Sequence, residues 1–399
     1  MGDNSSFFES QLITYIGNKR SLLDFIGQGL AQVQKELNKE NLTCLDLFSG
    51  SGIVARYLKQ FSSCLAVNDL ELYSCIINRC YLSNPGKEDE ETLRKLHKKL
   101  VEKINCKMEE IEKSRKEGTY SHPGFISELY SPQNLDDIKE NERCFYTPYN
   151  ANYLDVARQM IQSEVSESLQ PFFIAPLLSE ASIHANTAGI FKGFYKNSKT
   201  GRGQFGGNGK NALSRITGKI ELKMPLFLPN DCKTYIFNQN ADSLVTAPEL
   251  YACLPSSAGG QAFDLAYFDP PYNQHPYGSN YFMLNLIADY KRPDPAFISR
   301  VSGIPKDWNR SDYNKRKKVA EVFYNLVKNV KARFVLISFN SEGFIKKEDM
   351  ISLLNKIGKV QVMEAKYNAF RASRNLSERN IHVNEYLFLL DKRQALKEN

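Results

Sequence analysis

The sequence contains no long hydrophobic run, no closely paired cysteines and no internal repeat. Its apolar stretches, such as Phe172 to Leu178, are too short to span a bilayer. Met1 to Ser10 has neither the basic start nor the apolar centre of a signal peptide. The eight cysteines show no CxxC pair and no regular spacing. We therefore expect a cytoplasmic protein without membrane spans or a metal site, whose cysteines are reduced, buried and inert.

The chain does have size and a moderate positive charge. Its 399 residues are enough for two domains, and 42% hydrophobic residues are enough to bury a core. The formal net charge of +7 favours a polyanionic partner but does not define one.

The most informative stretch is Asp269-Pro270-Pro271-Tyr272, which follows the strand-like run Phe263 to Phe268. Two consecutive prolines cannot donate to a sheet ladder, so the strand must end there, with Asp269 at its carboxyl end. Ligands of open α/β sheets bind beyond these ends. A carboxylate, the Pro270 carbonyl and an aromatic ring suit a planar nitrogen base: the oxygens accept from its amine and Tyr272 stacks on its face.

A second pattern predicts a cofactor site. The apolar run Leu42 to Phe48 reads as a buried strand, Ser49-Gly50-Ser51-Gly52 as a turn, and Ile53 to Leu58 as a helix. Glycines let a ligand approach the backbone, and the helix amino terminus offers free N–H groups. Together with Ile53-Val54-Ala55, this turn also fits the GxGxxA form of the dinucleotide-binding fingerprint, so a nicotinamide-dependent dehydrogenase is the alternative interpretation. Asp46 would repel a pyrophosphate but could bind the ammonium of S-adenosylmethionine.

Further residues fit such a cofactor. Asp69 follows a second strand, Cys64 to Val67, where it could accept both ribose hydroxyls, with Glu71 as the alternative. Asp242 follows a third strand and could bind adenine, although a helix cap explains it equally well. The loop Ile13 to Arg20 could present Lys19 to a carboxylate while Tyr15 covers an aromatic ring.

The middle of the chain predicts a nucleic-acid contact. Lys87 to Lys116 has apolar residues at helical spacing and reads as a long amphipathic helix. Ala185 to Lys210 interleaves glycine, aromatic, basic and amide residues, which favours a β-hairpin that reads DNA over a flexible loop. A second basic and aromatic patch lies at Lys366 to Asn375. The candidate DNA-binding residues are Lys192, Lys196, Arg202, Gln204, Asn208, Lys210, Arg371 and Arg374.

The order of these motifs resembles the alpha group of DNA adenine-N6 methyltransferases, the group that contains Dam and several type II and type IIS modification enzymes. The resemblance implies an α/β, Rossmann-like, S-adenosylmethionine-dependent methyltransferase fold. Residues 1–83 and 230–399 would form the catalytic domain. Residues 84–229 would be an inserted target recognition domain, with a helical part and a β-hairpin around 190–210.

The resemblance also implies the roles of individual residues. Tyr15 and Lys19 match the loop that packs on the cofactor, and Asp46, Phe48, Gly50 and Gly52 match its glycine-turn motif. Asp69 matches the ribose ligand and Asp242 the adenine contact, while Asp269, Pro270 and Tyr272 match the catalytic motif. The implied enzyme is a monomer that flips adenine out of double-stranded DNA. It would be the modification enzyme of a restriction-modification system and thus the partner of a cognate endonuclease.

Several alternatives stay open at this point. Cytosine-N4 methyltransferases resemble this chain but usually carry Ser in place of Asp269. Structured RNA is a weaker candidate substrate. A dehydrogenase lacks a convincing hydride site among the five histidines. A non-catalytic DNA-binding subunit would not need an intact glycine turn and Asp-Pro-Pro-Tyr motif.

Overall fold

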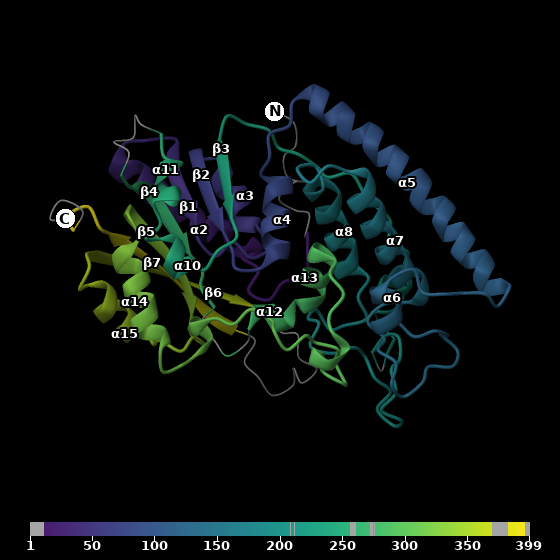
Figure 1. The fold of residues 1–399 in the computed structure, drawn as a ribbon. Helices are drawn as coiled ribbons and strands as arrows, with labels where there is room; N and C mark the ends of the chain where they lie inside the picture. The colour runs from purple at the N-terminus through teal and green to yellow at the C-terminus, as the bar shows by residue number, and fades with distance from the viewer. Residues whose placement is uncertain are drawn as a thin grey trace.

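The computed structural model describes residues 12–207, 209–210, 212–255, 261–271, 274, 276–368 and 382–395. These residues form a seven-stranded sheet in the order β3-β2-β1-β4-β5-β7-β6 (Figure 1). Strands β1 to β5 are parallel, and β7 runs antiparallel to both β5 and β6. The strands are β1 (Leu42–Asp46), β2 (Ser62–Asn68), β3 (Lys233–Phe237), β4 (Phe263–Phe268), β5 (Ala332–Asn340), β6 (Lys359–Asn368) and β7 (His382–Asp391).

Helices cover both faces of this sheet, as the apolar sequences of its central strands require. On one face, Leu30 of α2 and Leu58 of α3 pack on strand residues such as Leu336. On the other face, where Figure 1 shows α14 and α15, Phe323 of α14 packs on residues such as Val335. The helices of these two layers are η1 (Arg20–Leu22), α2 (Leu23–Leu37), α3 (Ile53–Lys59), α10 (Ala241–Leu244), α11 (Pro248–Ala252), η4 (Asp312–Asn314), α14 (Val319–Asn329) and α15 (Lys347–Leu354).

A separate helical layer lies beside the sheet, and much of it comes from residues 84–229 (Figure 1). Its apolar core joins α5 and α7 to α4, α8 and α13, through side chains such as Ile104, Leu154 and Leu177. The remaining helices are α4 (Leu72–Tyr81), α5 (Lys87–Lys116), α6 (Phe125–Leu129), α7 (Pro148–Glu164), α8 (Pro171–Ile183), α9 (Leu213–Thr217), α12 (Tyr277–Asn280), α13 (Phe282–Asp289) and η3 (Pro295–Phe297).

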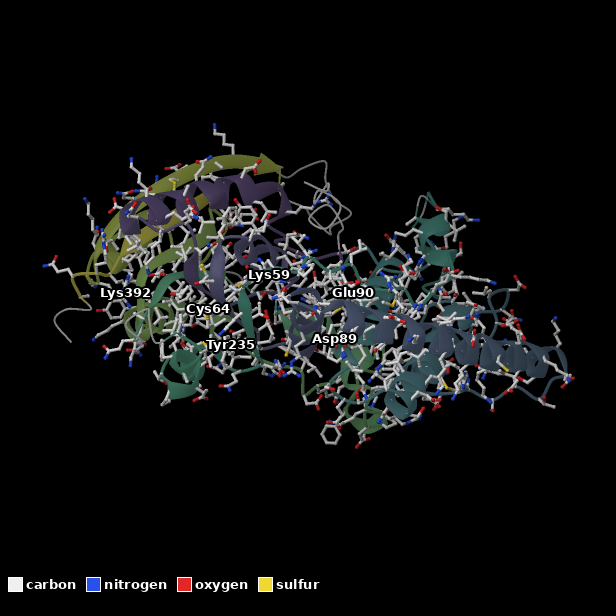
Figure 2. The ribbon with its side chains drawn as sticks, turned by 90° about the horizontal axis from the view of Figure 1, so that it is seen from above. Lys59, Cys64, Asp89, Glu90, Tyr235 and Lys392 are labelled. Carbon is white, nitrogen blue, oxygen red and sulfur yellow. The ribbon has the colours of Figure 1, made fainter. Side chains whose placement is uncertain are left out.

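Lys59 binds both segments that connect the sheet layer to residues 84–229. Its buried ammonium donates to the Ser83 carbonyl at 3.1 Å, to Asn84 Oδ1 at 2.7 Å and to the Leu228 carbonyl at 3.0 Å. Figure 2 shows Lys59 between the strands around Cys64 and the start of α5 near Glu90. The two ends of the 84–229 segment are therefore held side by side.

Most predicted elements agree with the structure, and two expectations need correction. The long helix expected over Lys87 to Lys116 has those bounds in α5. The expected β-hairpin around 190–210 is reduced to one antiparallel bridge between Lys196 and Gly203, because turn-forming residues leave little chain for a ladder. Cys106 is exposed, whereas the other seven cysteines are buried. No helix among the described residues is long and apolar enough to cross a membrane.

Candidate active site

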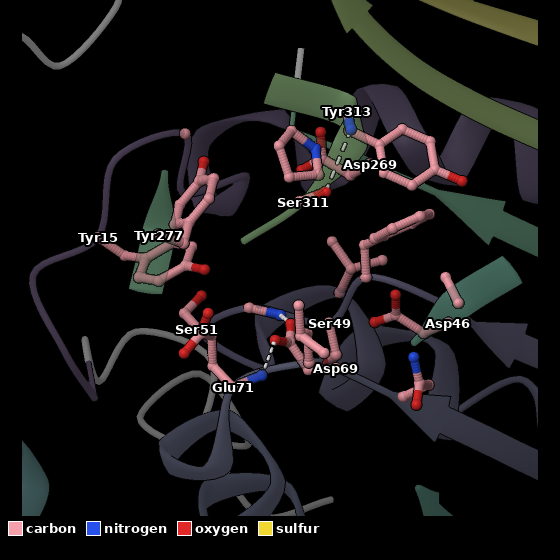
Figure 3. Close-up of a pocket in the computed structure, with 18 of the residues that line it drawn as sticks. Tyr15, Asp46, Ser49, Ser51, Asp69, Glu71, Asp269, Tyr277, Ser311 and Tyr313 are labelled. Carbon is pink, nitrogen blue, oxygen red and sulfur yellow. Dashed lines mark hydrogen bonds between the residues drawn. The ribbon is translucent and has the colours of Figure 1, made fainter. Parts of the chain in front are cut away.

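A pocket opens at the carboxyl edge of the parallel strands, where β1, β2 and β4 end. It encloses about 890 Å³ of empty space, counting its open mouth. Figure 3 shows acidic residues from three different strand ends around it. Six predicted cofactor residues and the predicted catalytic carboxylate line it together: Tyr15, Lys19, Asp46, Phe48, Gly50, Asp69 and Asp269. Segments far apart in the sequence therefore meet in one cavity.

The glycine turn forms one wall of the pocket. Gly50 has φ +54°, and a Cβ atom on it would lie 2.8 Å from the Tyr15 ring. The Gly50 amide donates to Asp69 Oδ2 at 2.7 Å, so β2 fixes the turn that follows β1 (Figure 3). Gly52, with φ +75°, faces Asn78 rather than the cavity. Only the first of these two glycines reaches the pocket.

Asp46 is the most unusual acidic residue of the pocket. It is fully buried, and neither of its carboxylate oxygens has a hydrogen-bond partner among the residues that the structure describes. Burial raises its pKa to about 8, an effect that the nearby Ser49 hydroxyl and Phe48 amide partly offset without bonds of good geometry. Burying an unpaired carboxylate costs free energy unless a ligand pairs with it, and a cationic group such as an ammonium would form that pair.

Asp69 and Glu71 differ in how much hydrogen-bonding capacity is already used. Asp69 accepts from the amides of Gly50 and Glu71. Glu71 accepts from the side-chain amides of Asn285 and Asn309. Burial raises the pKa of both carboxyl groups, that of Glu71 to about 7. Both line the pocket, so the geometry leaves both available to ligand hydroxyls.

A largely buried ion cluster lies behind the predicted catalytic motif. Lys19 Nζ is 3.1 Å from Asp269 Oδ1 and 3.0 Å from Glu385 Oε1. The loop before α2 thus presents Lys19 to a carboxylate, as the sequence indicated. Burial raises the pKa of Asp269 to about 6; the Lys19 charge opposes this shift and the Glu385 charge adds to it.

The prolines of the motif divide between pocket and core. Pro271 lines the cavity, whereas Pro270 is buried and does not line it. Tyr272 lies outside the described residues, as do the predicted DNA-binding residues Asn208, Arg371 and Arg374.

Aromatic rings close two sides of the pocket. The Tyr15 ring is stacked with Tyr277, at 5.1 Å between centroids, and with Tyr281, at 4.8 Å. Across the cavity, Tyr313 meets Phe48 edge-on at 5.3 Å (Figure 3). Asp242 does not line the pocket; it accepts a hydrogen bond from the Tyr313 hydroxyl at 2.9 Å. Asp242 therefore lies behind Tyr313 and outside the pocket lining, and its contact with adenine stays a prediction.

Several residues that connecting segments bring to the pocket were not predicted from the sequence. Asn309 donates to the Leu70 carbonyl and to Glu71 at the rim. No local pattern marks such loop residues. Glu385 did have a signal, because it is an acid directly before the apolar run Tyr386 to Leu390 of strand β7. The lining residues that were not predicted include Asn68, Gln239, Asn240, Tyr277, Asn309, Ser311, Tyr313 and Asn314.

The predicted DNA-contacting residues of the middle segment lie around a tight turn. The Asn197 amide donates to the Arg202 carbonyl at 2.8 Å, and the Gln204 amide to the Tyr195 carbonyl at 3.0 Å. Asn186 anchors the turn from below by donating to the Gln204 carbonyl. The side chains of Lys192, Arg202 and Lys210 are exposed, and those of Lys196 and Gln204 are half-buried.

The sheet order, with β7 antiparallel, and the pocket at its carboxyl edge define a Rossmann-like α/β methyltransferase. The model of the family described as D12 class N6 adenine-specific DNA methyltransferase matches residues 15–204 and 257–353. The chain belongs to this family, and it is an adenine-specific DNA methyltransferase. The match decides against the cytosine-N4, RNA, dehydrogenase and non-catalytic alternatives.

Individual relatives agree with this assignment. The chain is 30% identical over 386 residues to the type II methyltransferase M.CviAII of Paramecium bursaria Chlorella virus 1, covering 95% of this chain and 98% of the relative. It is 26% identical to the type II methyltransferase M.NlaIII of Neisseria lactamica, over 95% and 99% of the two chains. The modification methylase StsI of Streptococcus sanguinis is 25% identical, over 96% of this chain and 52% of its own length.

Proposed function

We propose that this protein transfers a methyl group from S-adenosylmethionine to N6 of an adenine flipped out of double-stranded DNA. It acts at a specific site, in the cytoplasm, as the modification enzyme of a restriction-modification system. The observation that carries the proposal is the single pocket that brings the Gly50 turn, Asp46 and Asp269 together. The restriction-modification role is supported by the similarity to M.CviAII and M.NlaIII, both of which are type II methyltransferases.

The residues present fit the cofactor. The unpaired carboxylate of Asp46 suits its ammonium group, and Asp69 with Glu71 suits the two hydroxyls of its ribose. The corner between Phe48 and Tyr313 offers ring faces and edges to its adenine. When bound, S-adenosylmethionine would supply the methyl carbon: a bond from this carbon to adenine N6 would form as the carbon–sulfur bond breaks, the electron pair would stay on sulfur, and the amine would release one proton to solvent.

The side chains would act by placement and charge. Adenine N6 is a poor nucleophile because its lone pair is delocalised into the ring. Hydrogen bonds from the amine to the Asp269 carboxylate and the Pro270 carbonyl would direct that lone pair toward the methyl carbon. Extrusion of the base costs a few kcal/mol, and stacking on Tyr272 would return about 1–3 kcal/mol.

The test of the reaction is DNA from a methylation-free host that expresses the chain, sequenced with detection of modified bases. We expect methylated adenines at one recurring sequence; modified cytosines alone, or no modification, would contradict the proposal. Methylation at that site should also block cleavage by a co-encoded endonuclease.

Two variants test the catalytic assignment. Asp269→Ala should abolish methylation while DNA binding and cofactor binding, measured by calorimetry, persist. Asp349→Ala, at an exposed position of α15, is the matched control and should keep full activity. Retained methylation in Asp269→Ala would remove Asp269 from the reaction.

A further inference from the structure

Glu385 is a buried glutamate that contacts Lys19, although Lys19 already forms an ion pair with Asp269. Only 1% of its side chain is exposed, and it comes from β7, two strands away from Asp269. Its Oε1 atom lies 3.0 Å from Lys19 Nζ and accepts from the Ser338 hydroxyl at 2.7 Å. Its Oε2 atom has no hydrogen-bond partner among the described residues.

The contact of two carboxylates with one buried ammonium is not expected to stabilise the fold. Lys19 and Asp269 alone would form a neutral pair, and Glu385 adds a second carboxylate to the same ammonium. A buried charge with unused acceptor capacity costs free energy, and apolar side chains of similar volume often replace such groups without loss. Its position therefore calls for a role in the site rather than in the core.

We propose that Glu385 is a positioning residue that shares the Lys19 ammonium with Asp269 and so keeps the Asp269 carboxylate a strong acceptor for the adenine amine. This inference rests on the proposed role of Asp269 in methyl transfer.

The physical reason is competition for one cation. A lysine that faced Asp269 alone would neutralise it and make it a weaker hydrogen-bond acceptor. Glu385 draws part of that charge toward β7 and holds the lysine behind the carboxylate. Among the residues that the structure describes, the other titratable groups that face Asp269 are Asp46 from β1 and Tyr267 from β4, and neither of these two contributes a cation.

The first test is Glu385→Gln, which keeps shape and removes charge. The carboxylates of Glu385 and Asp269 lie within hydrogen-bonding reach of the same nitrogen, so their charges interact strongly. We expect the acidic midpoint of kcat/KM against pH to fall by between about 0.5 and 2 pH units. The kcat at neutral pH should fall as well. Glu364→Gln, an exposed glutamate on β6, makes the same chemical change and should leave the midpoint in place.

A second measurement separates this inference from the proposed reaction. Aspartates labelled with 13C at the carboxyl carbon can be titrated by NMR without cofactor or DNA, and Asp269→Asn identifies the resonance. The Asp269 midpoint should fall in Glu385→Gln by the same amount. If the wild-type chain methylates no adenine while this shift is present, the proposed function is wrong, but the inference that Glu385 and Asp269 share the Lys19 ammonium is supported.

Ser338→Ala provides a variant with the opposite expected sign. Without the Ser338 hydroxyl, Glu385 loses a hydrogen-bond donor and should interact more strongly with the Lys19 ammonium. Lys19 would then stabilise the Asp269 carboxylate less, so the titration midpoint of Asp269 should rise. A purely structural role predicts lower stability in both variants and no opposed shifts. An unchanged Asp269 midpoint in folded Glu385→Gln, or in Ser338→Ala if the glutamine variant does not fold, would overturn the proposal.

Discussion

Asp46 shows at the scale of a single residue how a ligand site costs stability. Its pKa of about 8 lies above the value of an exposed aspartate, so between about pH 4 and 8 the folded protein binds a proton that the unfolded chain has lost. Stability from this group is therefore present at low pH and is lost as pH rises through that window. The slope is at most about 1.4 kcal/mol per pH unit.

We accordingly expect Asp46→Asn to flatten the fall of Tm between pH 5 and 8 in protein without cofactor. The same variant should weaken S-adenosylmethionine binding, because the ammonium loses its counter-charge. Thermal unfolding across pH and calorimetry of cofactor binding measure the two effects. Parallel Tm curves for wild type and variant would show that Asp46 ionises normally.

Gly50 offers a second prediction at this scale. Gly50→Ala should cost about 1–3 kcal/mol from its positive φ, and more from the contact of the new Cβ with Tyr15. Cofactor affinity should fall with it, because the turn must move. Gly118→Ala is the control: φ is +73° and nothing lies within 4 Å of the added Cβ, so about 1–2 kcal/mol of backbone strain is the whole effect. Equal losses of unfolding free energy for Gly50→Ala and Gly118→Ala in urea denaturation would show that the Tyr15 side chain moves aside without cost.

At the scale of elements, the sequence predicted those strands, turns and helices whose form depends on consecutive residues. The β1 strand, the turn through Gly50 and helix α3 follow one another in the sequence, and all were predicted. Strand β6 was missed because it is an edge strand whose exposed positions interrupt the apolar pattern. Asn309 and Tyr313 were missed because only tertiary folding brings their loop to the pocket. Prediction was therefore best where the site is built from consecutive residues.

Tyr313 gives the prediction for this loop. Tyr313→Phe keeps the ring against Phe48 and loses the bond to Asp242, so the Kd for S-adenosylmethionine should rise less than about tenfold. Tyr313→Ala also loses the ring and should raise the Kd by about 10-fold to 100-fold. Tyr251→Phe loses a comparable bond, to the Val245 carbonyl, outside the pocket and should bind normally. A Tyr313→Ala protein with wild-type Kd would exclude this wall from the cofactor site.

At the scale of the whole molecule, the net charge of +7 does not say where DNA binds. If contacts to phosphates lie on the turn around residues 192–210, removing two of its cations should change the salt dependence of binding, not only its strength. Each lost phosphate contact lowers the slope of log K against log salt by about 0.9. The double variant Lys192→Ala/Arg202→Ala should thus reduce the slope by about 2 for any DNA sequence.

The exposed pair Arg94 and Lys95 on α5 provides the matched control, since it carries the same two residue types in i,i+4 ion pairs with Glu90 and Glu91. Arg94→Ala/Lys95→Ala removes the same charge from a solvated helix face and should leave the slope nearly unchanged. Fluorescence anisotropy at several salt concentrations measures both. Equal slopes in the two double variants would mean that overall charge, and not the turn, governs DNA binding, and the recognition role of the turn around residues 192–210 would lose its support.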